Sequence, residues 1–241
     1  MKKAIKIREL EYIYPDGTKA LKGINLDIHR DECVGLIGPN GAGKSTLLLH
    51  LNGILRGTKG SVEVLGMEVK DENLVKIRQK VAIVFQEPDD QLFMPTVFDD
   101  VGFGPSNFGY PKEKVKEKVK KALEQVGMEG YEDRCSHHLS LGEKKKISIA
   151  TVLSMEPEIL ILDEPTISLD PRGRRELIEF LKNLSITRII AGHDLELIVE
   201  ICSRVILLDE GKIVTNGDPR GVLSNKSLME SHGLEVPLSL R

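Results

Sequence analysis

One nine-residue segment, residues 38–46, limits what this chain can fold into more than any other. It reads Gly-Pro-Asn-Gly-Ala-Gly-Lys-Ser-Thr, directly after the apolar run at 33–37 and directly before three leucines at 47–49. That order is typical of a buried strand, a glycine-rich loop and a helix, and it fits the nucleotide phosphate-loop pattern G-x-x-x-x-G-K-[ST]. The backbone N–H groups of such a loop face phosphates, and the helix N-terminus adds a partial positive charge. We therefore predict a nucleotide site at this loop.

Each residue type in the loop has a chemical reason to be there. Glycines take φ values closed to other residues and let the backbone approach an anion. Lys44 is expected to reach the β- and γ-phosphates, and Ser45 to offer its hydroxyl to Mg²⁺. The alternative, a glycine turn with a chance lysine, is disfavoured by the flanking strand and helix. The predicted nucleotide-binding residues here are Gly38, Pro39, Asn40, Gly41, Ala42, Gly43, Lys44, Ser45 and Thr46.

A second apolar run, residues 159–162, ends in two carboxylates, Asp163 and Glu164. Ligands of doubly wound sheets bind at the carboxyl ends of the strands, so both carboxylates are expected beside the phosphate loop. Asp163 is a candidate Mg²⁺ ligand, and Glu164 can polarise the water that attacks a γ-phosphoryl group. This pairing favours nucleotide hydrolysis.

Short apolar runs along the chain predict the rest of an α/β fold. Alternating segments at 5–8 and 24–28, separated by a Pro-Asp-Gly turn, predict antiparallel strands before the loop. Unbroken runs at 81–85, 159–162, 188–191 and 205–208 are typical of parallel strands covered on both faces. Segments 72–79 and 112–126 read as helices. The 241 residues are expected to form one domain, in which approximately residues 88–155 are a helical insertion.

Composition and charge limit the classes of partner and the location expected for the chain. A net charge of -3 gives no sign of a field that attracts nucleic acid, so no nucleic-acid partner is expected. No apolar run is long enough for a membrane span, and the first residues lack a secretory signal, which predicts a cytosolic chain unless a partner holds it at a membrane. Three widely spaced cysteines are expected to be reduced thiols. Cys135 with His137 and His138 is a weak candidate metal site that lacks a fourth ligand.

A further loop and helix start lies at residues 140–147, Ser-Leu-Gly-Glu-Lys-Lys-Lys-Ile. Ser140 and Gly142 at a helix N-terminus can form a second anion site. Two anion sites on one chain indicate a nucleotide held between two chains, each providing its phosphate loop to one site and its second helix to the other. The alternative is that Ser140 is simply a helix N-cap.

Taken together, these motifs resemble the ATP-binding cassette (ABC) ATPase family over nearly the whole chain. The resemblance implies ATP and Mg²⁺ as ligands, and a P-loop core with an N-terminal antiparallel β subdomain and a helical insertion. It implies Tyr14 as the aromatic residue on adenine, Gln86 as the glutamine near Mg²⁺ and the attacking water, and His193 as the switch histidine at the γ-phosphate. The catalytic residues it implies are Glu164, His193, Gln86 and Lys44, and the Mg²⁺ ligands are Ser45, Gln86 and Asp163.

The signature and D-loop of the family are also matched. Residues 139–143 stand where the signature is usually LSGGQ, with Leu141 in place of a glycine and Glu143 in place of the glutamine. The leucine restricts the backbone, and the carboxylate is expected to add negative charge near an anion. These departures leave open a weakly active homodimer or pairing with a different ATPase subunit. Residues 168–170 match the D-loop.

A narrower resemblance lies in residues 84–93 and 96–105, which look like the ATPase component of energy-coupling factor importers of the cobalt and nickel type. It implies transmembrane scaffold and substrate-binding membrane subunits as partners. It also implies a peripheral location on the cytoplasmic side of the cell membrane, and a transition-metal ion or vitamin as cargo. Apolar residues crowd this stretch, either as a partner surface or as packing of the helical insertion, namely Leu92, Phe93, Met94, Val97 and Phe98.

Two alternatives of other classes remain. A soluble cassette ATPase acting on nucleic acid or ribosomes would need a long coiled coil or a second cassette, and neither is visible in the sequence. A nucleotide-binding regulator without turnover is disfavoured because Lys44, Asp163, Glu164 and His193 are all present. An assay of ATP turnover separates the regulator from both ATPases.

Overall fold

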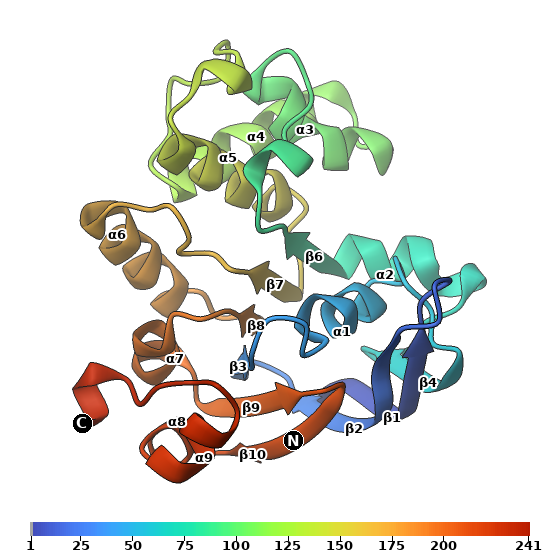
Figure 1. The fold of residues 1–241 in the computed structure, drawn as a ribbon. Coiled ribbons are helices and arrows are strands. Elements are labelled where there is room, and N and C mark those ends of the chain that lie inside the picture. Colours follow the sequence, from blue (N-terminus) through green and yellow to red (C-terminus); the bar gives the residue numbers. More distant parts are fainter. Residues whose placement is uncertain (1) are drawn as a thin grey trace.

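A four-stranded antiparallel sheet forms one side of the protein in the computed structural model, which describes residues 2–241. Its order is β2-β1-β4-β5, and β1 pairs antiparallel with both β2 and β4 (Figure 1). The predicted antiparallel start of the chain is therefore confirmed. The strands are β1 (Lys3–Ile13), β2 (Lys19–His29), β4 (Lys59–Val64) and the short β5 (Met67–Glu68), which the sequence analysis did not find.

A six-stranded sheet forms the centre, in the order β10-β9-β3-β8-β7-β6. Its strands are parallel except for the edge pair β10 and β9. The predicted α/β fold with a mixed, largely parallel sheet is confirmed, although β10 was missed because its residues alternate between exposed and half-buried. The strands are β3 (Cys33–Ile37), β6 (Val81–Val84), β7 (Ile159–Asp163), β8 (Thr187–Ala191), β9 (Arg204–Asp209) and β10 (Lys212–Gly217).

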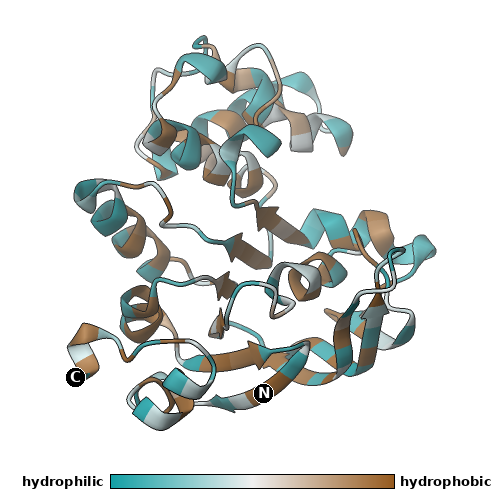
Figure 2. Ribbon diagram, viewed as in Figure 1, coloured by the Kyte–Doolittle hydropathy of each residue, from teal (hydrophilic) through white to brown (hydrophobic). Residues whose placement is uncertain are grey.

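Both faces of the central sheet are buried, because successive strand residues point to opposite sides. On β7, Ile159 and Ile161 pack toward the N-terminal sheet, whereas Leu160 and Leu162 pack toward the helices of the other face. This explains the unbroken apolar runs in the sequence, which appear as brown strands in Figure 2. The helices around the sheet are α1 (Lys44–Leu51), α2 (Leu74–Lys80), α6 (Pro171–Lys182), α7 (Leu195–Ile201), α8 (Pro219–Leu223) and α9 (Lys226–Ser231).

Three helices stand apart from the sheets at the top of Figure 1, beyond the ends of β6 and β7. They are α3 (Val97–Asn107), α4 (Lys112–Gln125) and α5 (Leu141–Leu153). The predicted helix at 112–126 is confirmed to within one residue, and its apolar side packs inside this group through Val115, Val119 and Leu123. The boundaries 88–155 for a helical insertion stay a prediction. Among residues 2–241, no helix combines the length and apolar character needed to cross a bilayer.

Candidate active site

The phosphate loop runs from the end of β3 to α1, and two of its glycines are required by their surroundings. Gly38 has φ of 151°, and a Cβ there would lie 1.9 Å from the carbonyl oxygen of Leu208. Gly43 has φ of 103°, and its Cβ would lie 2.7 Å from the carbonyl oxygen of Ala20. Neither contact is tolerable for a side chain, so the loop can fold against β9 and β2 only with glycine at both positions.

Lys44 lies over the loop and is only 8% exposed. Its Nζ donates to the carbonyl oxygens of Gly38, at 2.7 Å, and Pro39, at 3.1 Å. Burial lowers the pKa of Lys44, while the carboxylates of Glu164 and Asp163 act in the opposite direction. The ammonium group is thus held by weak carbonyl acceptors at the place where a stronger, charged acceptor would bind.

Glu164 follows β7 and is the most enclosed carboxylate of the site, at 7% exposed. Its backbone is fixed in a left-handed conformation, with φ of 48°, and its N–H donates to the carbonyl of Ala191 on β8. Its side-chain Oε2 accepts from the backbone N–H of His193 at 3.2 Å. A Cβ at Gly192 would come within 2.9 Å of the same oxygen, so a side chain there would displace the carboxylate from its present position.

His193 leads from β8 into α7 and bends over the phosphate loop. Its Nε2 lies 3.0 Å from Oδ1 of Asn40, 3.5 Å from Nζ of Lys44 and 3.5 Å from Oε1 of Glu164. The next residue, Asp194, caps α7 and receives a two-pronged ion pair from Arg174 of α6, which fixes the turn that carries the histidine.

Asn40, Lys44 and Glu164 line one cavity of about 610 Å³, and His193 lies within 3.5 Å of each of these three residues. Tyr14 also faces it and is fixed by a hydrogen bond between its hydroxyl and Oγ1 of Thr46, at 2.9 Å. Ser45, Gln86 and Asp163 bring three oxygen-bearing side chains to the same cavity, which suits a hard divalent cation such as Mg²⁺. These residues were predicted from the sequence, whereas Lys19 and Lys22 at the start of β2 and Glu210 in the turn after β9 also line the cavity and were not.

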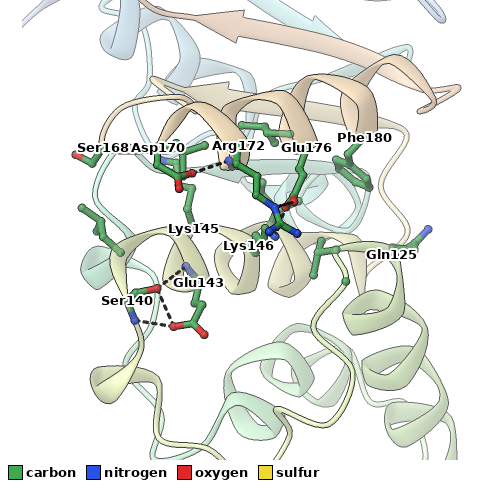
Figure 3. Close-up of a pocket in the computed structure, with 18 residues that line it drawn as sticks. Gln125, Ser140, Glu143, Lys145, Lys146, Ser168, Asp170, Arg172, Glu176 and Phe180 are labelled. Carbon is green, nitrogen blue, oxygen red and sulfur yellow. Dashed lines mark hydrogen bonds and ion pairs between the residues drawn. The ribbon is translucent and has the colours of Figure 1, made fainter.

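The signature residues do not join this cavity. Ser140 and Gly142 line a separate cleft of about 870 Å³ between α5 and α6, together with Ser168 and Asp170 of the predicted D-loop (Figure 3). Both Ser140 and Leu141 are exposed there. The chain therefore keeps its two predicted anion sites apart, as expected if each serves a different nucleotide.

The local structure of the signature shows how the charge expected at Glu143 is held. Its carboxylate lines the cleft and accepts from Ser140 and from the hydroxyl of Tyr131, at 2.7 to 2.8 Å. Ser140 in turn caps α5 by accepting from the N–H of Glu143, which completes a capping box. Ser140 is thus an N-cap, as the alternative interpretation had it, and its role toward an anion stays a prediction.

Two further residues, which the sequence analysis missed, tie the Gln86 segment to the signature helix. Lys145 of α5 is 2% exposed and donates to the carbonyls of Phe85 and Gln86, and burial lowers its pKa to about 8. Gln91 accepts from the N–H of Phe85 and donates to the carbonyl of Ser148 on α5. In the sequence, Lys145 is the middle of three lysines that read as a solvated helix, so nothing marked it out.

Residues 2–241 contain no group of three or more His, Cys, Asp or Glu side chains that could hold a metal ion, so Cys135, His137 and His138 do not form one. The three cysteines are free thiols.

The site combines a phosphate loop, an adjacent carboxylate pair and a histidine over the loop. It lies on a mixed sheet that has a helical group above it. Together these features define the class of ATP-hydrolysing cassette proteins.

Comparison with known families agrees with this class. The model of the family described as ABC transporter matches residues 21–167, and the chain belongs to that family: it is an ABC transporter ATPase. It is 52% identical to the energy-coupling factor transporter ATP-binding protein EcfA of Methanothermobacter thermautotrophicus, over 97% of this chain and 76% of that protein.

Solved structures show the same fold. cbiO1 from Clostridium perfringens, described as part of the ABC transporter complex cbiONQ, superimposes with a TM-score of 0.84 at 41% identity, covering 96% of this chain and 94% of that one. A dimeric ATP-binding cassette bound to ADP and Pi superimposes with a TM-score of 0.81 at 28% identity, covering 90% of this chain and 99% of that one.

Proposed function

We propose that this chain is the ATP-hydrolysing subunit of an importer of the energy-coupling factor type. The observation that supports this most is that His193 lies 3.5 Å from both Lys44 and Glu164, two residues that line the phosphate-loop cavity, in a chain 52% identical to an energy-coupling factor ATP-binding protein. The cavity is suited to ATP, because backbone N–H groups, the α1 N-terminus and Lys44 all favour a polyphosphate.

In the proposed mechanism each residue has a separate task. Lys44 exchanges its loop carbonyls for the β- and γ-phosphates, since an anion is a stronger acceptor than a carbonyl. Glu164, held by the backbone of His193, accepts a proton from the attacking water. His193 moves from Asn40 to the γ-phosphate. Tyr14 offers its ring to adenine.

A bound Mg²⁺ would neutralise charge that develops on the phosphate oxygens. Ser45, Gln86 and Asp163 are the residues proposed to hold it, because all three line the cavity beside the loop. Gln86 has a second task in this proposal: its backbone is tied to α5 by Lys145, so an occupied site can shift the signature helix.

The catalytic unit we propose is a dimer, a homodimer or a hetero-pair, in which Ser140 and Gly142 of one chain complete the phosphate site of the other. Support comes from their placement in a cleft apart from the loop cavity, and from the dimeric cassette that superimposes on this chain. Closure on ATP and reopening after hydrolysis would then drive a membrane partner.

The segment after Gln86 is the proposed contact with a transmembrane scaffold, at the cytoplasmic face of the cell membrane. The structure divides its apolar residues into two groups. Leu92 and Val97 are buried in the core, as the packing alternative predicted, and Met94 and Phe98 are half-buried. Phe93, however, is 57% exposed and lies edge-on to Phe103, which is 41% exposed, so two aromatic rings face solvent together.

A matched pair of variants tests this contact. Phe93→Asp should abolish capture of the membrane subunits from native membranes, whereas Val75→Asp, at a 66% exposed apolar site on α2, should not. Both variants should keep the ATPase rate and melting temperature of the parent, because both side chains lie outside the loop cavity. Unchanged capture by the Phe93 variant would contradict the proposed contact.

The cargo is proposed as a cobalt or nickel ion, or a vitamin, because residues 84–93 and 96–105 resemble energy-coupling factor ATPases of the cobalt and nickel type. A separate membrane subunit would select it, so no residue of this chain is assigned to it. Mass spectrometry of subunits that co-purify with the tagged chain, followed by uptake of labelled Co²⁺ or Ni²⁺ in vesicles, is the measurement that identifies the cargo.

A further inference from the structure

At the start of α5, Ser140 and Glu143 form hydrogen bonds with each other in both directions. Oε2 of Glu143 accepts from the backbone N–H of Ser140 at 2.8 Å and from its hydroxyl at 2.7 Å, and both contacts are visible in Figure 3. The serine oxygen accepts from the N–H of Glu143 at 3.4 Å. The only proton of the Ser140 hydroxyl is therefore directed at a carboxylate of its own helix.

This arrangement places an anion of the chain where an external anion would have to bind. The N-terminus of a helix attracts negative charge, and a carboxylate in its first turn meets that demand. Hydrogen bonds to an ionised acceptor are about twice as strong as those to a neutral one. A phosphate that approaches Ser140 must therefore displace an acceptor of its own kind.

The second oxygen of the carboxylate is held on the opposite side. Oε1 of Glu143 accepts from the hydroxyl of Tyr131 at 2.8 Å, and the guanidinium of Arg134 lies 3.7 Å from the centre of the Tyr131 ring. The bonds from Ser140, and then that from Tyr131, lower the pKa of Glu143. Glu143 thus has a partner that it can keep when it releases the serine.

We propose that Glu143 is a positioning residue that sets the affinity of the signature helix for the γ-phosphate of a facing chain. Glu143 holds Ser140 until the phosphate displaces it, and Tyr131 then retains the released carboxylate. This inference rests on the proposed function of Ser140 at a shared site. It makes Glu143 and Tyr131 opposing determinants of how much ATP is needed for dimer closure.

The test measures the ATP concentration for half-maximal dimer formation by light scattering, in chains that also carry Glu164→Gln to prevent turnover. Glu143→Gln keeps the side-chain size but removes the charge, so it should lower this concentration about three- to tenfold. Tyr131→Phe removes only the retaining bond and should raise it about threefold. When both changes are combined, the Tyr131 change should have little further effect.

Opposite signs for the two variants support the proposal, because loss of a merely structural contact would weaken closure in both. Equal concentrations in the Glu143→Gln variant and its parent would overturn it while leaving the shared site intact. If the parent stays monomeric, recovery of the dimer by Glu143→Gln supports the proposal, and no recovery overturns both it and the site shared by two copies of this chain. Should Glu143→Gln melt early, the measurements are made below its melting temperature, and a Tyr131 change that raises the ATP concentration equally with and without Glu143→Gln overturns the proposal.

Discussion

The phosphate-loop cavity and the signature cleft differ in how their functional side chains are held within one chain. In the cavity, strands β3, β7 and β8 and the turn before α7 fix Lys44, Glu164 and His193 against one another. In the cleft, Ser140 is exposed, and its contacts are with its own helix. The difference teaches that the cavity residues are positioned by one another within a single chain, and it agrees with the proposal that a second chain completes the cleft.

The largest effect on ATP turnover should come from a change inside the phosphate-loop cavity. Glu164→Gln keeps the shape of the side chain but removes the proton acceptor, so ATP turnover should fall on the order of 100- to 10,000-fold. ATP affinity should remain, since the loop and Lys44 are unchanged. Phosphate release and equilibrium ATP binding by the purified chain are the two measurements. A variant with near-normal turnover would remove Glu164 from its proposed role.

A mixing experiment tests whether the signature cleft is completed by a second copy. Lys44→Ala removes the charge at the loop, and Ser140→Ala removes the hydroxyl of the cleft, so each variant alone should turn over ATP at least about tenfold more slowly. In an equimolar mixture about half of the dimers pair the two variants, and each of these keeps one intact site of two. Turnover should therefore recover to about a quarter of the parent rate.

The control for that recovery is a mixture of Lys44→Ala with the double variant Lys44→Ala, Ser140→Ala, which contains no intact site and should stay inactive. A first mixture that is no more active than its separate components would mean that two copies of this chain do not share sites. The proposed hetero-pair with a different ATPase subunit would then be the working unit.

The same contrast explains what could be predicted from the sequence. The strand, loop and helix of residues 33–51 are contiguous, and each residue type there has one physical reason, so the part of the cavity lining that lies in the phosphate loop could be predicted, whereas Lys19, Lys22 and Glu210 could not. Contacts between segments that are distant in the sequence could not be predicted from residue types in this way. Lys145 looked like one of three surface lysines, although its amine is buried against the carbonyls of Phe85 and Gln86.

Glu143 shows the limit most directly. Its charge was visible in the sequence, but its hydrogen-bond partners, Tyr131 twelve residues earlier and Ser140 in a capping box, were not. Short edge strands such as β5 were missed for a related reason: two residues carry no periodicity, and only pairing with β4 makes them a strand.

A smaller effect, on the free energy of unfolding, is expected where the Gln86 segment is joined to the signature helix α5. Gln91→Ala removes the side chain that links the N–H of Phe85 to the carbonyl of Ser148 and the hydroxyl of Thr151. The stranded backbone groups should lower the free energy of unfolding by about 1–3 kcal/mol in urea denaturation. Gln79→Ala, at an exposed position on α2, is the control and should change it by less than about 0.5 kcal/mol. Equal losses would mean that Gln91 is not a structural link.

The smallest effect concerns the edge of the phosphate-loop cavity, where Tyr14 bonds to Thr46 through its hydroxyl. Tyr14→Phe keeps the ring for adenine and removes only that bond, so the free energy of unfolding should fall by about 1 kcal/mol, with ATP affinity changed less than about twofold. Tyr12→Phe is the matched control. Tyr12 packs edge-on against both Tyr14 and His50 through its ring, and the change to Phe keeps these contacts. If Tyr14→Phe instead weakened ATP binding tenfold, the hydroxyl rather than the ring would contact the nucleotide, and the adenine position would have to be revised.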